Sequence, residues 1–298
     1  MAPLRLALVG AGRMGSTHAR ALGEAVVALV EPSDEAAARS GIARRHRSLD
    51  ELVAEGGVDG AIVAVPTRLH AEVVSRLLDG GIPVLCEKPC GLTSAEARAL
   101  AARAADAGLP LHVGYWRRFV PALRELRATL AAGSFGDLEL VACAQWDERP
   151  PPAAFRDPAS SGGILVDMGV HEFDELRWLT GQEIVSVTGV ASEAHVDGDP
   201  DGVALALRLD GGATGVVSLL RHHPPGDLCR VEVVGTKDAV RIDFLAPADG
   251  EQVFLEALRA QAADFAAAVA GQASAGATPD DAARALEVAE RATLSIAR

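Results

Sequence analysis

Short apolar runs alternate with amphipathic stretches over the first 113 residues. The apolar runs are too continuous to leave one polar face, which is typical of strands buried on both sides. The stretches between them have helical periodicity. Ser48-Leu49-Asp50-Glu51 has the pattern of a capping box, and a second helix begins at Thr93 or Ser94 and ends before Gly108. We predict strands at Leu4–Val9, Val26–Val30, Gly60–Val65, Pro83–Cys86 and Leu111–Val113.

This alternation of strands and helices predicts an α/β fold. Strands that follow one another through helices form a parallel sheet with right-handed crossovers and helices on both faces. The sequence therefore predicts an N-terminal Rossmann domain, a doubly wound parallel sheet, over residues 1–116.

The pattern changes after Tyr115. A helix is predicted after Pro121, followed by a strand at Leu138–Trp146, a proline-rich loop, and a helix opened by Gly162-Gly163. Five further strands are separated by short turns, and two alanine-rich helices close the chain, at Glu251–Ala270 and Pro279–Ala297. The strands are Ile184–His195, Val203–Leu209, Ala213–Leu220, Leu228–Val234 and Ala239–Phe244.

Short connections between consecutive strands favour antiparallel pairing. We therefore predict that residues 117–298 form a C-terminal α+β domain with an open, mostly antiparallel sheet.

Composition restricts the classes of partner. The chain is 49% hydrophobic and 23% charged, and it has no apolar run of about 18 residues, so no membrane span is expected. The N-terminus lacks the pattern of a secretory signal, which favours a cytoplasmic location. A net charge of -13 repels nucleic acid and anionic lipid, so small molecules are the expected partners.

The cysteines and lysines add two observations. The four cysteines contain no C-x-x-C pair, so we expect reduced thiols and no metal site. Lys88 and Lys237 are the only lysines among 28 basic residues. Lys237 lies in a predicted turn and is expected to be a solvated charge. Lys88 instead follows the end of a predicted buried strand. An amine at that position can donate or accept a proton in a reaction.

A glycine motif, Gly10-Ala11-Gly12-Arg13-Met14-Gly15, directly follows the first predicted strand and opens a helix. Gly10 permits a tight turn, Gly12 lets the backbone approach a pyrophosphate, and Gly15 allows close packing of helix and strand. Glu31 ends the second strand, where its carboxylate accepts hydrogen bonds from ribose hydroxyls and repels a 2′-phosphate. The motif therefore predicts NAD, and Arg13, which can reach a phosphate, keeps NADP open.

Two more strands end in polar segments. Pro66-Thr67 and His70 follow the strand at Gly60–Val65, and Glu87-Lys88-Pro89 follows the next one. Ligands of doubly wound folds bind at the carboxyl ends of the strands. We therefore expect both segments to lie close to the nicotinamide.

The helix opened by Gly162-Gly163 carries Asp167, His171 and Asp174. Their spacing of four and three residues predicts that all three share one helix face. A carboxylate and an imidazole placed in this way suit proton transfer, with the acid orienting the base. A solvated polar helix face is the alternative interpretation of the same spacing.

Taken together, these motifs resemble the Gfo/Idh/MocA family of oxidoreductases, and the resemblance covers nearly the whole chain. Within the family the chain looks most like the inositol 2-dehydrogenases. The segments that carry the resemblance are Gly10–Gly15, Pro66-Thr67 with His70, Glu87-Lys88-Pro89, Gly114–Phe119, and Gly162-Gly163 followed by Asp167, Gly169, His171 and Asp174.

The resemblance implies an NAD-dependent dehydrogenase that is a homo-oligomer, either a dimer or a tetramer. It also implies that the second domain, residues 117–298, binds substrate and supports oligomerisation. Lys88, Asp167 and His171 match the family's catalytic group: lysine polarises the reacting oxygen, histidine takes the hydroxyl proton and aspartate supports the transfer. The residues expected to contact the cofactor are Gly10, Gly12, Arg13, Met14, Gly15, Glu31, Pro66, Thr67, His70, Glu87 and Lys88. Those expected to contact substrate are Lys88, Arg118, Asp167, His171 and Asp174.

The expected substrate is a polyol or sugar, such as an inositol, oxidised at a secondary alcohol. Neighbouring hydroxyls each donate and accept hydrogen bonds. The chain offers them acceptors at Asp167, His171 and Asp174, and donors at Lys88 and Arg118. One departure bears on the substrate pocket: inositol dehydrogenases carry a tyrosine just before the strand that corresponds to Leu228–Val234, where this chain has Pro225-Gly226-Asp227.

Two other classes of function remain open. A protein that senses NAD(H) without turnover would need the glycine motif, but it would have no use for a lysine aimed at the nicotinamide. A metal-dependent enzyme would use Asp167 and His171, with His222-His223 as further ligands.

Overall fold

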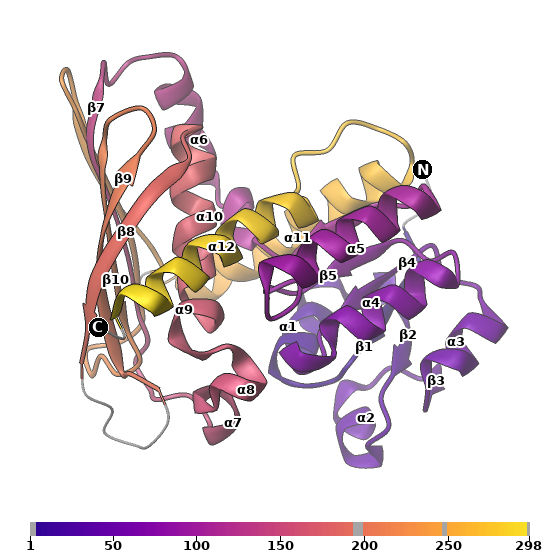
Figure 1. Cartoon of the computed structure of the whole chain (residues 1–298). Helices are drawn as coiled ribbons and strands as arrows, with labels where there is room; N and C mark the ends of the chain where they lie inside the picture. The colour runs from indigo at the N-terminus through magenta and orange to yellow at the C-terminus, as the bar shows by residue number, and fades with distance from the viewer. Residues whose placement is uncertain (1–3, 193–198, 246–248, 297–298) are drawn as a thin grey trace. The chain divides into compact units, whose positions relative to one another are not determined.

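The computed structural model describes residues 4–192, 199–245 and 249–296 (Figure 1). The chain forms two compact units. The first contains residues 1–116 and 255–283, and the second contains residues 117–254 and 284–298. Residues 255–283, which the sequence division placed in the second domain, thus pack with the first unit.

The first unit is built on a parallel six-stranded sheet in the order β3-β2-β1-β4-β5-β6. This is the strand order of a Rossmann fold, and it confirms the predicted doubly wound sheet. The strand β3 was not predicted, because its two residues carry no apolar run. The strands are β1 (Leu6–Val9), β2 (Val26–Val30), β3 (Arg45–His46), β4 (Gly60–Val63), β5 (Val84–Cys86) and β6 (Leu111–Val113).

Helices cover both faces of this sheet, and α4 and α5 lie in front of it in Figure 1. The predicted caps form: Ser48 Oγ accepts from the Glu51 N–H at 3.3 Å, and Thr93 Oγ1 accepts from the Glu96 N–H at 3.2 Å. The helical segments are α1 (Arg13–Leu22), η1 (Gly23–Ala25), α2 (Asp34–Ser40), α3 (Leu49–Glu55), η2 (Thr67–Leu69), α4 (His70–Asp79), α5 (Ser94–Ala107) and α11 (Gly250–Val269).

Phe265 explains why α11 packs with the first unit. Its fully buried ring belongs to a core cluster with Leu8 of β1 and Ile62 of β4. Gly60 makes room for the ring, because a Cβ there would lie 2.9 Å from Phe265 Cε1. Arg259 Nε also donates to the Ala21 carbonyl of α1 at 2.8 Å. Burial of apolar surface on the sheet therefore holds α11 on this unit.

The second unit has a mixed six-stranded sheet in the order β12-β11-β7-β10-β9-β8. The β7 and β10 strands are parallel, and the other neighbours are antiparallel. This confirms the predicted mostly antiparallel sheet. The strands are β7 (Leu138–Trp146), β8 (Ile184–Ala191), β9 (Gly202–Leu209), β10 (Thr214–Leu220), β11 (Leu228–Gly235) and β12 (Ala239–Leu245). The predicted extension of β8 to His195 lies outside the described residues.

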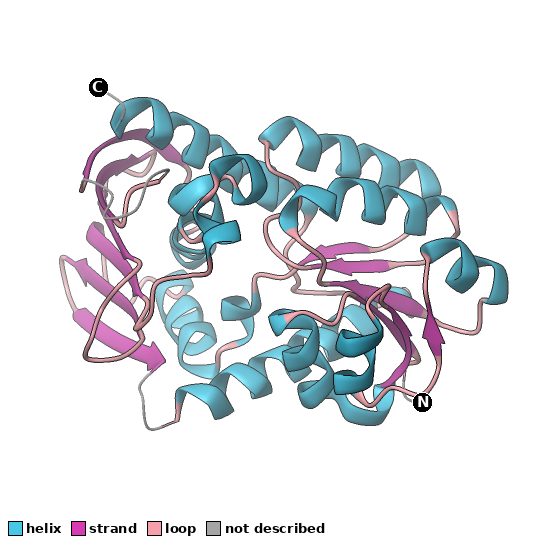
Figure 2. Ribbon diagram, turned by 90° about the horizontal axis from the view of Figure 1, so that it is seen from below, coloured by secondary structure: helices cyan, strands magenta, loops and turns pink. Residues whose placement is uncertain are grey.

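Buried and exposed residues alternate along β9 and β10, so one face of this sheet is covered and the other is open. Among the described residues, helices pack on one face only (Figure 2). The contacts with β7 and β10 come from α10. The helical segments that lie wholly or mostly in this unit are η3 (Trp116–Phe119), α6 (Pro121–Ala131), α7 (Ala153–Arg156), α8 (Pro158–Ser161), α9 (Gly163–Asp167), α10 (Gly169–Thr180) and α12 (Pro279–Ile296).

In the described parts of the chain, we find no helix with the length and apolar character that a membrane crossing requires. The four cysteines are all buried and form no disulfide.

Candidate active site

The glycine motif has the geometry that its spacing predicts. Gly10 has a φ of 98°, and a Cβ there would lie 2.7 Å from the Ala64 carbonyl oxygen. Gly15 packs against the turn, because its Cβ would lie 2.0 Å from the Gly10 oxygen. Neither position accepts a side chain without a shift of the backbone.

Gly12 differs from both, because a Cβ there would meet nothing within 4 Å. It is the N-cap residue of α1, whose first turn contains no acidic residue. Open space in front of unpaired helix N–H groups is suited to a pyrophosphate, since the helix dipole also favours negative charge there. The residues present therefore fit a dinucleotide.

The Glu31 carboxylate is oriented by two backbone donors. Its Oε2 accepts from the Ala11 N–H and its Oε1 from the Ser33 N–H, each at 2.9 Å. Each carboxylate oxygen retains acceptor capacity for a ribose hydroxyl. Glu31 thus connects the glycine motif with the end of β2, which is where an adenosine ribose binds in Rossmann folds.

Arg45 is a neighbour of Glu31 that the sequence did not indicate. The pairing of β3 with β2 brings Arg45 beside Glu31, and its Nε donates to the Glu31 carbonyl oxygen at 2.9 Å. Its Nη1 donates to Asp34 Oδ1 at 2.5 Å. The guanidinium charge is therefore paired with a carboxylate instead of facing the ribose site alone.

Lys88 lies where the sequence predicts, two residues after the end of β5. The Glu87 N–H donates to the Val63 carbonyl at the end of β4 at 2.9 Å, which fixes the segment against its neighbouring strand. Pro66 is exposed and Thr67 begins the short η2 helix after β4. Because the strands are parallel, these segments share the sheet edge with the glycine motif.

His70 connects the two segments. Its Nδ1 lies 2.7 Å from the Pro89 carbonyl oxygen and its Nε2 lies 2.9 Å from that of Val65. The side chain is buried, and burial lowers the pKa of the imidazole. His70 therefore ties the ends of β4 and β5 together, and its contact with the cofactor stays a prediction.

In the second unit, the prediction that Asp167, His171 and Asp174 lie on one continuous helix is wrong. Asp167 ends α9, whereas the other two lie on α10 after a break at Met168. Gly169, a weak helix former, permits the break and a close approach, since a Cβ there would lie 3.1 Å from Phe173 Cε2. The His171 N–H donates to the Met168 carbonyl at 3.0 Å, across the turn that separates the two helices.

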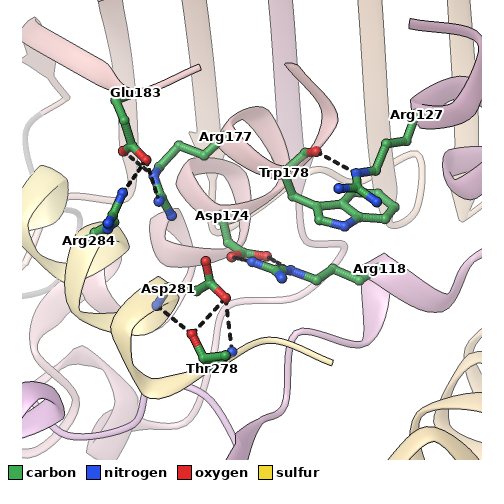
Figure 3. Close-up of polar contacts among 9 residues, drawn as sticks. All are labelled: Arg118, Arg127, Asp174, Arg177, Trp178, Glu183, Thr278, Asp281 and Arg284. Atoms are coloured by element: carbon green, nitrogen blue, oxygen red, sulfur yellow. Dashed lines mark hydrogen bonds and ion pairs between the residues drawn. The ribbon is translucent and has the colours of Figure 1, made fainter. Parts of the chain in front are cut away.

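Arg118 and Asp174, both predicted to contact substrate, are paired with each other (Figure 3). Two further acids on α10 pair with Arg117, which donates to Glu172 Oε1 and Glu175 Oε2 at 2.6 Å each. Burial, opposed by the charge of Arg117, raises the pKa of Glu175 to about 7. No motif in the sequence indicates that Glu172 and Glu175 form a buried cluster with Arg117.

Within the described residues, no group of three or more His, Cys, Asp or Glu side chains is arranged to hold a metal ion. His223, one of the histidines of the metal hypothesis, packs against Trp146 with ring centroids 5.1 Å apart. Its Nδ1 lies 2.5 Å from the Gly226 carbonyl oxygen.

The strand order, the glycine motif and Glu31 define the first unit as a dinucleotide-binding domain. Residues 4–115 match the model of the oxidoreductase family with an NAD-binding Rossmann fold, and residues 123–241 match that of the GFO/IDH/MocA C-terminal domain. The chain belongs to the Gfo/Idh/MocA family, as its motifs predict, and NAD is its cofactor.

Individual relatives agree with this assignment. The chain is 46% identical over 310 residues to the rhizopine catabolism protein MocA of Rhizobium meliloti, covering 100% of this chain and 96% of that protein. It is 35% identical to the inositol 2-dehydrogenase of Rhizobium meliloti strain 1021, covering 82% and 77%. Among solved structures, GenD2 from gentamicin A biosynthesis, in complex with NAD, superposes with a TM-score of 0.93 at 27% identity, covering 100% and 95%.

Proposed function

We propose that this protein oxidises a secondary alcohol of a cyclitol or sugar to a ketone and passes the hydride to NAD. The observation that carries the proposal is the combination of an NAD-binding fold with Lys88 two residues after the end of β5, on the edge that bears the glycine motif. The names of the relatives support an inositol as substrate, and 46% identity to a rhizopine catabolism protein makes rhizopine a further candidate.

Lys88, Asp167 and His171 carry the chemistry in this proposal. Lys88 donates a hydrogen bond to the oxygen of the reacting hydroxyl, and His171 accepts the proton of that hydroxyl as general base. Asp167 orients the imidazole and stabilises its charged form. NAD supplies the hydride acceptor when it is bound. The carbon loses a hydride and its oxygen loses a proton, which leaves a ketone.

The substrate-binding group combines donors and acceptors in this proposal. Asp167 and His171 accept hydrogen bonds from ring hydroxyls, and Lys88 donates to their oxygens. Arg118 and Asp174 are members of the predicted group whose mutual pairing limits the atoms they have for substrate. In the proposal these two side chains therefore shape the wall of the substrate pocket. They contact the substrate only through the hydrogen-bonding capacity that their mutual pairing does not use.

The proposed assembly is a homo-oligomer, a dimer or a tetramer, formed through the open face of the second unit's sheet. Val190 and Val216 are 69% and 37% exposed on β8 and β10. Exposed apolar side chains on an uncovered sheet favour burial against a second copy. We place the protein in the cytoplasm, with no nucleic-acid partner, in keeping with its net charge of -13.

The test is NADH formation by the purified protein against a panel of inositols, rhizopine, free sugars, sugar phosphates and sugar acids. The proposal predicts turnover with one or more cyclitols or free sugars. Activity restricted to sugar phosphates or apolar alcohols contradicts the substrate class. Tight NADH binding with no turnover on any member of the panel favours a sensor instead of an enzyme.

A further inference from the structure

A buried pair of polar side chains lies beside Lys88, and the proposed chemistry does not use it. His18 Nε2 lies 2.6 Å from Glu87 Oε1, with the two side chains 1% and 5% exposed. His18 comes from α1 and Glu87 follows β5, so the contact joins residues that are 69 positions apart. Both residues belong to the first unit.

The free energy of folding alone does not account for this pair. Burying a carboxylate and an imidazole costs solvation free energy, and apolar side chains of similar size pack in such places without that cost. His18 Nδ1 is also buried and has no hydrogen-bond partner among the described residues. A buried polar atom without a partner adds to the solvation cost of burying the pair.

Glu87 transmits the contact to the backbone of Lys88. Its Oε1 faces His18, and its Oε2 accepts from the Lys88 N–H at 3.3 Å. Gly114 leaves room for this carboxylate, because a Cβ there would lie 2.9 Å from Glu87 Oε2. On the other side of the lysine, His70 holds the Pro89 carbonyl. The segment that carries Lys88 is thus held at both ends by imidazoles.

His18 lies on the helix whose first turn faces the open space at Gly12. The His18–Glu87 contact therefore links the element that binds the cofactor to the segment that carries the lysine. We propose that His18 and Glu87 form a positioning pair that fixes Lys88 relative to the glycine-motif helix. This inference rests on the proposed function, in which Lys88 acts at the reacting oxygen. Displacement of a reacting group by about 1 Å costs about 10²-fold in rate.

Two similar substitutions of His18 separate positioning from packing. Gln places an amide N–H close to the position of Nε2, whereas Asn places its amide near Nδ1 and is too short to reach Glu87. We expect His18→Asn to lower kcat about 10²-fold and His18→Gln to stay within about tenfold of the parent. The dissociation constant for NADH should change by less than about threefold in both variants, because the glycine motif is intact.

The isotope effect distinguishes a misplaced lysine from a smaller folded fraction. With substrate deuterated at the reacting carbon, His18→Asn should give a larger kinetic isotope effect on kcat than the parent, because hydride transfer becomes more rate-limiting. Loss of folded protein lowers kcat without changing this ratio. Glu87→Gln combined with His18→Asn should be no slower than His18→Asn alone, because the two residues act as a unit.

His46→Asn is the matched control. His46 is also a buried histidine of the first unit with a carboxylate partner, since its Nδ1 lies 3.6 Å from Glu55 Oε2. Three strands separate its strand, β3, from β5. The proposal is overturned if His18→Asn has the kcat and isotope effect of the parent. It is also overturned if His18→Asn and His46→Asn lose equal kcat with no change in isotope effect. Absence of turnover in the parent refutes the proposed function itself.

Discussion

Arg118 donates two hydrogen bonds to Asp174, from Nε to Oδ2 at 2.9 Å and from Nη2 to Oδ1 at 2.5 Å (Figure 3). The two side chains are 8% and 2% exposed. Both were predicted from the sequence to contact substrate, and the structure gives them a shared role within the second unit. Their pairing connects η3 to α10, the helix that also carries His171.

Removal of Arg118 should destabilise the protein, because the buried carboxylate of Asp174 loses the guanidinium that donates two hydrogen bonds to it. We expect Arg118→Ala to lower the free energy of unfolding by about 3–5 kcal/mol, measured by urea denaturation. Replacing both residues by leucine should cost less than the single substitution, since no buried charge remains. The control Arg124→Ala, on the exposed side of α6, should change stability by about 0.5 kcal/mol or less. An equal effect of the two alanine substitutions would contradict the account.

Glu31 should determine the choice of cofactor. The Ala11 and Ser33 N–H groups orient its carboxylate at the end of β2. In Rossmann folds an acid at this position binds the ribose hydroxyls, and its charge disfavours a 2′-phosphate. We expect Glu31→Ala to lower the ratio of kcat/KM for NAD over NADP by about tenfold or more, which is about 1.4 kcal/mol or more. Glu35→Ala, an exposed acid on α2, is the control and should leave the ratio unchanged. Equal use of NAD and NADP by the parent would refute this role for Glu31.

Lys88 and His171 should be required for turnover and not for cofactor binding. Lys88→Ala and His171→Ala are each expected to lower kcat by about 10²–10⁴-fold, the usual contribution of general acid–base groups. NADH binding, followed by fluorescence titration, should remain close to that of the parent. Lys237→Ala removes the only other lysine and should keep parental kcat. Near-normal turnover of the His171 variant would show that another group takes the proton.

The ion pairs of Glu183 predict that the stability of the protein depends on pH. Arg177, by its hydrogen bond, and Arg284 lower the pKa of Glu183 to about 2 (Figure 3). A glutamate in the unfolded chain has a pKa of about 4.3. The pKa is depressed in the folded state, so the contribution to stability is complete above about pH 5 and is lost as the pH falls toward 2.

Glu183→Gln should therefore lower the free energy of unfolding at pH 7 by about 1 kcal/mol, after allowance for screening of a partly exposed pair. The difference from the parent should shrink as the pH falls from about 5 to about 2, in denaturation experiments repeated across that range. Glu125→Gln, an exposed glutamate of α6, is the control. A difference that stays constant with pH would show that the ion pairs contribute little.

The sequence predicts an element of the fold when its burial leaves a pattern within the element's own residues. Strands buried on both faces appear as continuous apolar runs, which is why β2 and β6 were placed at their observed bounds. The β3 strand consists of Arg45 and His46 and has no such run. The position of α11 depends on Phe265, whose burial on the first sheet is a tertiary contact that an alanine-rich helix does not reveal.

The candidate site likewise has some features that a local motif predicts and others that depend on packing between distant segments. The roles of Gly10 and Gly15 follow from chain geometry that the motif encodes, and the structure has that geometry. The break at Met168 was missed because the spacing of Asp167 and His171 is also that of a continuous helix. His18 and Glu87 are 69 positions apart, and only the packing of α1 over the sheet brings them into contact.

Isotope labelling tests directly whether the hydride passes from a ring carbon of the substrate to NAD. The purified protein is incubated with NAD and with inositols deuterated at the ring carbons that bear hydroxyl groups, and the mass of the reduced cofactor is measured. We expect the reduced nicotinamide to carry the deuterium and the cyclitol product to be a ketone, and we expect Lys88→Ala to give neither. Reduced cofactor without deuterium, or no reduction with any cyclitol or sugar, would contradict it.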